Sequence, residues 1–160
     1  MKKTTKFLII FCAISFFNYS SVYSAGSTSD GYDNAGLYKQ GKKLVLRAKK
    51  LEKKNKNEKA EKIYLKALNK FEKAYAKDKK NADILNYLGY TLRKTGNLKK
   101  AENFYLKGLK LDEGHLGINE YLGELYVQTN RIELAKKRLE VLNGCKCEEY
   151  EDLKKLIENK

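Results

Sequence analysis

The sequence predicts an all-α fold: a short right-handed α-solenoid of antiparallel helix hairpins, closed by a C-terminal capping helix. The 160-residue chain contains no proline, and Leu, Ala, Lys and Glu, which favour helices, dominate from Leu37 onward. Small and large residues also recur every 34 residues. Such a fixed interval is typical of stacked helical hairpins, none of which can bury its apolar face alone.

The first 24 residues have the layout of a secretory signal peptide. Three lysines precede an apolar stretch from Phe7 to Phe17, and small or polar residues follow it. This stretch is shorter than the roughly 20 residues that span a bilayer, so removal is favoured over an uncleaved anchor. We place the cut after Ser24, with a cut after Ala25 as the alternative, and expect a periplasmic or secreted protein.

The repeat is clearest in the second half of the chain. Leu88-Gly89 recurs 34 residues later as Leu122-Gly123. A small residue and a bulky one recur at the same interval: Ala67, Ala101 and Ala135, each followed four residues later by Phe71, Tyr105 and Leu139. Glycine and alanine let two helices approach where they cross, and the bulky side chains fill the space around the crossing.

This spacing resembles that of the tetratricopeptide repeat. The resemblance implies one repeat over residues 82–115 and another over residues 116–144, each a pair of antiparallel helices. Gly96 and Asn130 stand between the paired helices, where a positive φ is expected. Glu113 stands where the family usually has a proline. With its predicted signal peptide, the chain looks like an exported bacterial member of the family.

Residues 37–81 are expected to form a degenerate first hairpin, preceded by a flexible N-terminus over residues 25–36. The Leu-Gly pair is missing at the expected distance before Ala67, but a suitable apolar pattern begins seven residues earlier, at Leu44. Because seven residues make two helical turns, we predict that the second helix of this hairpin is lengthened by about two turns.

Residues 145–160 are expected to form the C-terminal cap. Tyr150, Leu153, Leu156 and Ile157 share one face of the predicted helix, and several acids stand at its start. Acids there suit the helix dipole. A helix with one polar face can cover the apolar end of a repeat stack.

The resemblance also implies a concave groove lined by the first helix of each repeat. It places there Asn86, Tyr87, Tyr90, Arg93 and Lys94 from one repeat and Glu120, Tyr121, Glu124 and Gln128 from the next. Tyrosine and arginine are good anchors for a bound peptide; the alternative is that the tyrosines only pack against the neighbouring helix. The basic clamp by which some family members hold the C-terminus of chaperones is not matched, so we expect another protein or peptide partner.

Cys145 and Cys147 are the only cysteines after the predicted signal peptide, and three interpretations compete. The pair can form a structural disulfide or remain as packed thiols, exchange with other thiols, or bind a soft ion such as Cu(I). We favour the structural interpretation, because the lone histidine, His115, and the lone methionine are distant in sequence.

The basic residues are concentrated in one segment. Residues 42–80 hold 16 Lys or Arg against 5 Asp or Glu, whereas residues 81–160 hold 14 against 13. This segment either contacts an anionic surface of the cell envelope or carries lysines that only face water. An exported protein seldom meets nucleic acid, so no nucleic-acid partner is predicted.

Together these features predict a non-enzymatic scaffold of the bacterial cell envelope that binds a partner through its groove. No catalytic residues, metal site or cofactor are predicted, because no catalytic triad, phosphate-binding loop or four-ligand metal spacing is found. The alternative is a thiol-redox or copper-handling accessory protein whose repeats serve as a docking module. Three repeats are close to the minimum for a stable stack, so a homo-oligomer is also expected to be feasible.

Overall fold

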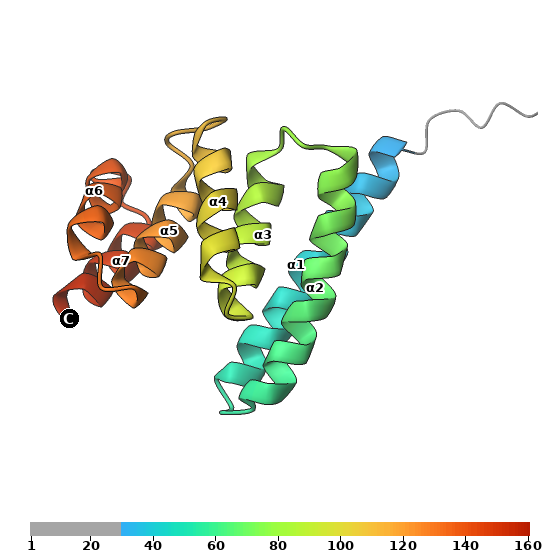
Figure 1. Cartoon of the computed structure of the whole chain (residues 1–160), viewed down its shortest axis with the longest axis horizontal. Coiled ribbons are helices and arrows are strands. Elements are labelled where there is room, and N and C mark those ends of the chain that lie inside the picture. Colours follow the sequence, from blue (N-terminus) through green and yellow to red (C-terminus); the bar gives the residue numbers. More distant parts are fainter. Residues whose placement is uncertain (1–29) are drawn as a thin grey trace, which may run out of the picture.

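The computed structural model describes residues 30–160, with side chains from Asn34 onward; the predicted signal peptide and its cleavage site lie outside this range. Residues 30–160 form seven α-helices and no strand, which confirms the predicted all-α fold (Figure 1). None of these seven helices is both long enough and apolar enough to cross a membrane.

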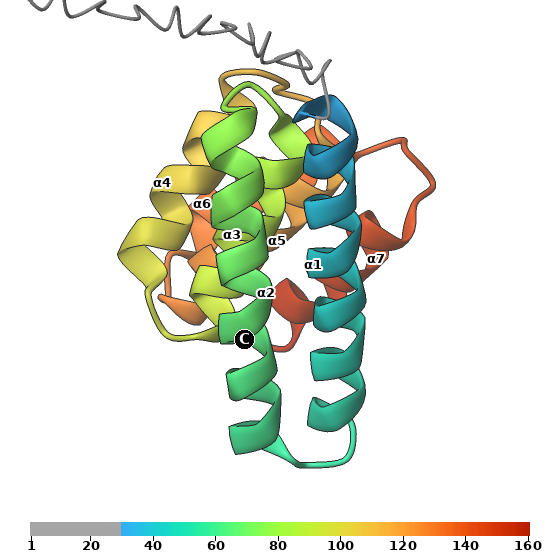
Figure 2. The ribbon, with the colours of Figure 1, turned by 90° about the vertical axis from the view of Figure 1, so that its right-hand side faces the viewer.

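Six of the helices pair in succession as antiparallel hairpins, and the seventh packs on the last pair. The hairpins are stacked side by side, and the first extends beyond the others (Figures 1 and 2). The pairs are α1 (Asp30–Glu52) with α2 (Asn57–Lys77), α3 (Ala82–Lys94) with α4 (Leu98–Leu109), and α5 (Leu116–Gln128) with α6 (Ile132–Leu142), followed by α7 (Glu148–Glu158).

Local signals set the ends of the helices. The Asn81 side chain accepts a hydrogen bond from the backbone N–H of Ile84 at the start of α3, which satisfies a donor that the helix itself leaves unpaired. Gly96 and Asn130 have φ values of 82° and 59°. The positive φ predicted for both inter-helix turns is therefore confirmed.

A glycine lies at the crossing of the two helices in the first and second hairpins. A Cβ atom on Gly89 of α3 would lie 2.4 Å from the Tyr105 ring of α4, and one on Gly41 of α1 would lie 2.5 Å from the Phe71 ring of α2. Both rings are fully buried. The close approach predicted at Gly89 is confirmed, whereas the equivalent role of Gly41 was not predicted.

The equivalence of Gly41 and Gly89 is not visible from the 34-residue interval, because both helices of the first hairpin are long. Helices α1 and α2 have 23 and 21 residues, against 13 and 12 for α3 and α4. The predicted lengthening of the second helix is confirmed, but α1 is lengthened as well. The added turns move Gly41 away from its partner in sequence while leaving the crossing intact.

The N-terminal boundary of this hairpin was predicted wrongly for residues 30–36, which are helical rather than flexible. The contacts of the next turn explain the longer helix. Leu37 is buried in the core, and the Tyr38 ring lies 6.1 Å from the Phe71 ring and 5.6 Å from the Tyr87 ring, measured between centroids. These contacts hold α1 against α2 and α3 well before Leu44.

Helix α7 packs against both α5 and α6. Its Leu153 is fully buried, and a Cβ atom on Gly123 of α5 would lie 2.5 Å from the Leu153 side chain. Burying a leucine contributes roughly 2 kcal/mol. Leu153 therefore supplies much of the attachment of α7 to the stack.

Candidate functional site: the inner surface

The first helices of the hairpins, together with α7, form one side of the stack, which we call the inner surface. It contains two cavities. The polar cavity, of about 440 Å³, is lined chiefly by Tyr38, Lys42, Asp83, Asn86, Tyr87, Asp112, His115, Gly117, Glu120, Tyr121 and Glu149. The terminal cavity, of about 450 Å³, is lined by Arg93, Glu124, Val127, Gln128, Asp152, Leu156 and Lys160.

Seven of the nine residues that the sequence placed in a groove line one of these cavities. The polar cavity receives Asn86, Tyr87, Glu120 and Tyr121, and the terminal cavity receives Arg93, Glu124 and Gln128. They lie on one side of the stack because α3 and α5 are the first helices of successive repeats, so equivalent positions on the two helices face the same way.

The other two predicted groove residues have different positions. Tyr90 is only 4% exposed, and its ring packs between those of Tyr64 and Tyr121, with centroids 5.9 and 4.8 Å away. Lys94 forms an ion pair of 2.6 Å with Glu52, at the end of α1. Tyr90 therefore packs neighbouring helices together, and Lys94 ties α3 to the first hairpin.

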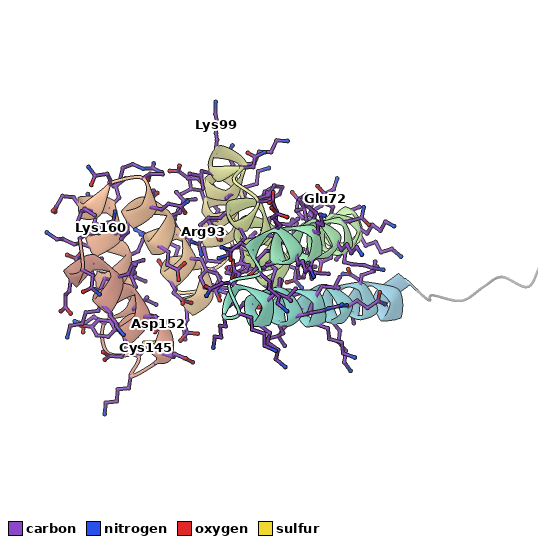
Figure 3. All side chains as sticks on the ribbon, turned by 90° about the horizontal axis from the view of Figure 1, so that it is seen from below. Glu72, Arg93, Lys99, Cys145, Asp152 and Lys160 are labelled. Carbon is purple, nitrogen blue, oxygen red and sulfur yellow. A yellow bond between two sulfur atoms is a disulfide. The ribbon has the colours of Figure 1, made fainter. Side chains whose placement is uncertain are left out.

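An ion pair lines the terminal cavity. Arg93 of α3 donates a hydrogen bond to the Glu124 carboxylate of α5, and both side chains are largely buried. The Arg93 guanidinium also lies 5.6 Å from the centroid of the Tyr90 ring. Figure 3 shows Arg93 near the middle of the molecule, whereas Lys99 projects from α4. Such a pair orients two helices, and removing one partner leaves a buried charge behind.

Two lysines of α1 reach over aromatic rings on the inner surface. The Lys42 ammonium lies 5.3 Å from the Tyr38 ring centroid and 5.8 Å from that of Tyr87. The Lys49 ammonium lies 5.0 Å from the Tyr90 ring centroid and donates a hydrogen bond of 3.4 Å to the Tyr121 hydroxyl. All three distances between an ammonium group and a ring centroid suit cation–π attraction. These two lysines were not predicted to lie at the site, although their spacing of two helical turns places them on one face of α1.

Glu120 is an unusual carboxyl group for a protein surface, because it is only 8% exposed. Burial raises its pKa to about 8, helped by the nearby carboxylates of Glu124, Glu149 and Asp152, while Lys49 acts in the opposite direction. The lysine is too distant to form an ion pair with it. Glu120 is therefore protonated in most molecules near neutral pH.

His115, the lone histidine, caps helix α5. Its Nδ1 atom accepts a hydrogen bond of 3.2 Å from the backbone N–H of Ile118, and its Nε2 atom lies 3.6 Å from the Asp83 carboxylate. The cap holds the start of α5 at the mouth of the polar cavity.

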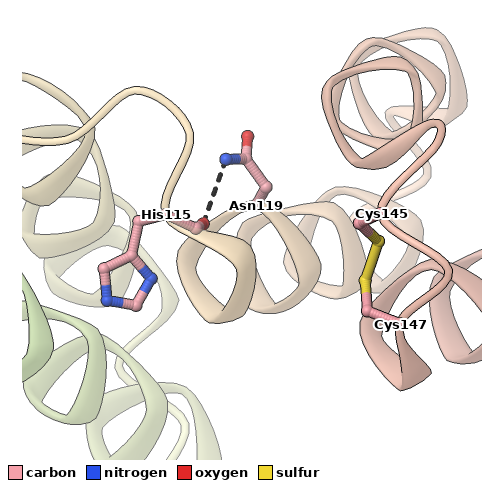
Figure 4. The surroundings of a disulfide bond; sticks show 4 residues. All are labelled: His115, Asn119, Cys145 and Cys147. Carbon is pink, nitrogen blue, oxygen red and sulfur yellow. Dashed lines mark hydrogen bonds between the residues drawn. A yellow bond between two sulfur atoms is a disulfide. The ribbon is translucent and has the colours of Figure 1, made fainter.

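Cys145 and Cys147 are joined by a disulfide in the loop before α7, with their Cα atoms 5.2 Å apart (Figure 4). In this state neither sulfur is a thiolate that could attack another disulfide or bind Cu(I). Among residues 30–160, no group of three or more His, Cys, Asp or Glu side chains is arranged to hold a metal ion.

The comparisons with known proteins agree with this architecture. The tetratricopeptide repeat family model matches residues 44–114, whereas no curated protein matches the chain. The first TPR domain of the human RPAP3 protein is 19% identical and has a TM-score of 0.55, covering 74% of this chain and 90% of that domain.

Two further solved domains show the same fold. The Arabidopsis OM64 TPR domain is 12% identical, with a TM-score of 0.54, over 77% of this chain and 98% of that one. The second TPR domain of human RPAP3, in complex with the HSP70 peptide SGPTIEEVD, is 17% identical, with a TM-score of 0.51, over 72% and 97%. The chain therefore has the all-α fold of tetratricopeptide repeat proteins, and its similarity to their family model extends over residues 44–114.

Proposed function

We propose that this protein is a non-enzymatic scaffold that holds a segment of another polypeptide along its inner surface. The observation that carries this proposal is the pair of cavities on one side of the stack. Tyrosine rings line the polar cavity, and the largely buried pair of Arg93 and Glu124 lines the terminal cavity. Such surfaces bind extended or helical segments because aromatic rings offer contact area and fixed polar groups offer hydrogen bonds.

Domains of the same fold give the proposal a precedent. The first TPR of Spaghetti (RPAP3), with a TM-score of 0.53, is bound to the HSP90 peptide SRMEEVD, and the second TPR domain of human RPAP3 is bound to the HSP70 peptide SGPTIEEVD. Both peptides end in acidic sequences. Carboxylates of Asp83, Asp112, Glu120 and Glu149 line the polar cavity here, so we expect a partner segment of different charge.

Site-specific photocrosslinking tests the proposal. A photoreactive amino acid replaces Tyr87 or Gln128 on the inner surface, or Glu72 or Lys99 on α2 and α4 as matched controls. We expect one partner to crosslink from both inner positions and from neither control. Equal crosslinking from all four positions, or crosslinking only from the controls, rules out the inner surface as the binding site.

We also propose that the protein works in the cell envelope after export. The proposal rests on the arrangement of lysines and apolar residues before Ser24. The mass of the mature protein, measured after fractionation of the producing cells, identifies the cleavage site. A cytoplasmic protein of full mass contradicts export.

A second surface supports an additional contact with the envelope. Five lysines of α2, which we call the lysine stripe, are spaced three or four residues apart and so share one face: Lys59, Lys62, Lys66, Lys70 and Lys73. Glu61 and Glu72 lie on the other side of the helix at 3.6 residues per turn. We propose that the lysine stripe contacts an anionic surface such as acidic lipid headgroups.

Cosedimentation with vesicles tests this contact. We expect binding to vesicles that contain phosphatidylglycerol, no binding to phosphatidylcholine alone, and loss of binding at high salt. Replacing Lys62, Lys66, Lys70 and Lys73 with glutamine should weaken binding at least tenfold, because each lysine near such a surface contributes about 1 kcal/mol. The same replacement of Lys99, Lys100 and Lys107 of α4 and of Lys110 at its C-terminal end is the control. An equal loss there contradicts a specific role for the lysine stripe.

A further inference from the structure

The polar cavity holds more hydrogen-bond acceptors than donors. Carboxylates of Asp83, Asp112, Glu120 and Glu149 line it, from α3, the α4–α5 loop, α5 and α7. Lys42 is the lysine among its lining residues, and the Lys42 ammonium already lies over two tyrosine rings. A ligand that fits this cavity must therefore bring donors or positive charge.

One acceptor is buried without a partner, and a second carries no internal pairing. Asn86 is 5% exposed, and its Oδ1 atom accepts no hydrogen bond. Glu120 is 8% exposed and makes no hydrogen bond or ion pair with any residue that the structure describes. Buried polar groups are nearly always paired, so the Asn86 Oδ1 atom points to a donor that is supplied from outside the chain. The Glu120 carboxyl group, which has no internal partner, is free to receive another donor beside it.

The walls of the cavity suit a cation as well. Tyr87 and Tyr121 present their rings beside Glu120, and both already attract a lysine of α1: Lys42 lies over Tyr87, and Lys49 lies over Tyr121. The negative face of an aromatic ring stabilises an ammonium or guanidinium group. These internal lysines show which kind of group the rings accept.

We infer that the polar cavity binds a lysine or arginine side chain of the partner segment, with Glu120 as the counter-ion and the Asn86 Oδ1 atom as a hydrogen-bond acceptor. This inference rests on the proposed function and specifies the chemistry of its ligand. A carboxylate and an amide oxygen can receive the several N–H groups of either cation. It also predicts that acidic peptides such as those bound by other domains of this fold bind this cavity poorly.

The protonation of Glu120 links binding to pH. Its pKa of about 8 means that a bound cation must first displace a proton from most molecules at neutral pH. Lys49 of α1, Glu124 of α5, and Glu149 and Asp152 of α7 all influence this carboxyl group. Binding should therefore release a proton and become roughly tenfold tighter between pH 7 and pH 9, where Glu120 ionises.

The test uses a blocked pentapeptide with a central lysine between alanines, and the same peptide with acetyl-lysine, which has the same backbone but no charge. In a titration of the ¹⁵N-labelled protein, we expect the lysine peptide to shift the amide signals of Asn86, Gly117 and Glu120, and the acetyl-lysine peptide to bind at least tenfold more weakly. Glu120→Gln should abolish this preference and the pH dependence, both measured by calorimetry. Glu133→Gln, on the exposed face of α6, should keep both.

The outcomes separate this inference from the proposed function. If both peptides bind the polar cavity equally, or if Glu120→Gln still prefers lysine, the inference is wrong although the inner surface still holds a polypeptide. If neither peptide shifts these signals and photocrosslinking at Tyr87 finds no partner, both are wrong. Because glutamine has nearly the shape of glutamic acid, we expect Glu120→Gln to fold; thermal melting checks this, and the pH dependence of the unmodified protein tests the inference independently.

Discussion

The two ends of the stack are built differently. At the C-terminal end, α7 covers the last hairpin, and Leu153 fills the space left by Gly123. At the N-terminal end no further helix of the described chain covers the first hairpin, and Gly41 receives Phe71 from the hairpin's own second helix. A glycine in the first helix of a repeat therefore permits a close contact, but its position in the stack decides which helix makes that contact.

The two ends of the stack also differ in the exposure of their leucines and in the charge around them. Leu65 of α2 is 50% exposed, and it lines a surface hollow together with Leu44, Lys66 and Lys70. Leu153 at the other end is fully buried. The basic, uncovered end therefore leaves apolar and basic side chains free to contact another surface, whereas α7 buries the apolar side chains of the other end.

The largest expected effect on stability comes from removing a buried side chain at the C-terminal end of the stack, which α7 covers. Leu153→Ala removes a fully buried side chain and leaves a cavity, so we expect it to lower the free energy of unfolding by about 3 kcal/mol. Leu65→Ala, at the uncovered end, should change it by less than about 0.5 kcal/mol. Urea denaturation measures both. Equal losses at the two leucines would show that the first hairpin is also covered in solution.

A smaller effect on stability is expected at two glycines of α1, which should respond to alanine in opposite directions. Gly41→Ala places a methyl group 2.5 Å from the buried Phe71 ring, and we expect a loss of about 2 kcal/mol. Gly36→Ala meets no atom within 4 Å and should raise stability by roughly 0.5–1 kcal/mol, because alanine favours helix. Thermal melting distinguishes the two variants; destabilisation by Gly36→Ala contradicts the helical start of α1 at Asp30.

The smallest expected effect is at the disulfide that precedes α7. Replacing Cys145 and Cys147 with serine opens a loop of only three residues, for which loop-closure entropy predicts a loss of about 1.5 kcal/mol or less. We expect photocrosslinking from Tyr87 and Gln128 to be unchanged. Loss of function in a folded serine variant would instead favour the thiol-exchange or copper-handling alternative.

Much of the architecture could be predicted from the sequence because it depends on local patterns. The 34-residue interval placed small residues such as Gly89 opposite bulky ones such as Tyr105, and this contact is present. The turns at Gly96 and Asn130 need a positive φ, which few residue types tolerate. The two longer helices of the first hairpin broke the interval, so the role of Gly41 could not be found by comparing positions at a fixed distance.

The candidate site was less predictable. The repeat pattern identified which positions of α3 and α5 face the inner surface, but it could not show that Tyr90 is buried between Tyr64 and Tyr121. It also gave no sign that Lys42 and Lys49 reach across from α1. These contacts join segments far apart in the chain, and their distances depend on how the hairpins pack.

By itself, the sequence determined that this chain forms stacked helical hairpins, since helix propensity and the spacing of small residues act over a few turns of one or two neighbouring helices. Only the tertiary structure decided that Lys42 and Lys49 lie over the tyrosine rings and that the Glu120 side chain is largely buried. Burial and electrostatic environment are sums over all surrounding elements. For Glu120 those elements are α1, α5 and α7, whose charged groups come together only when the whole stack has formed.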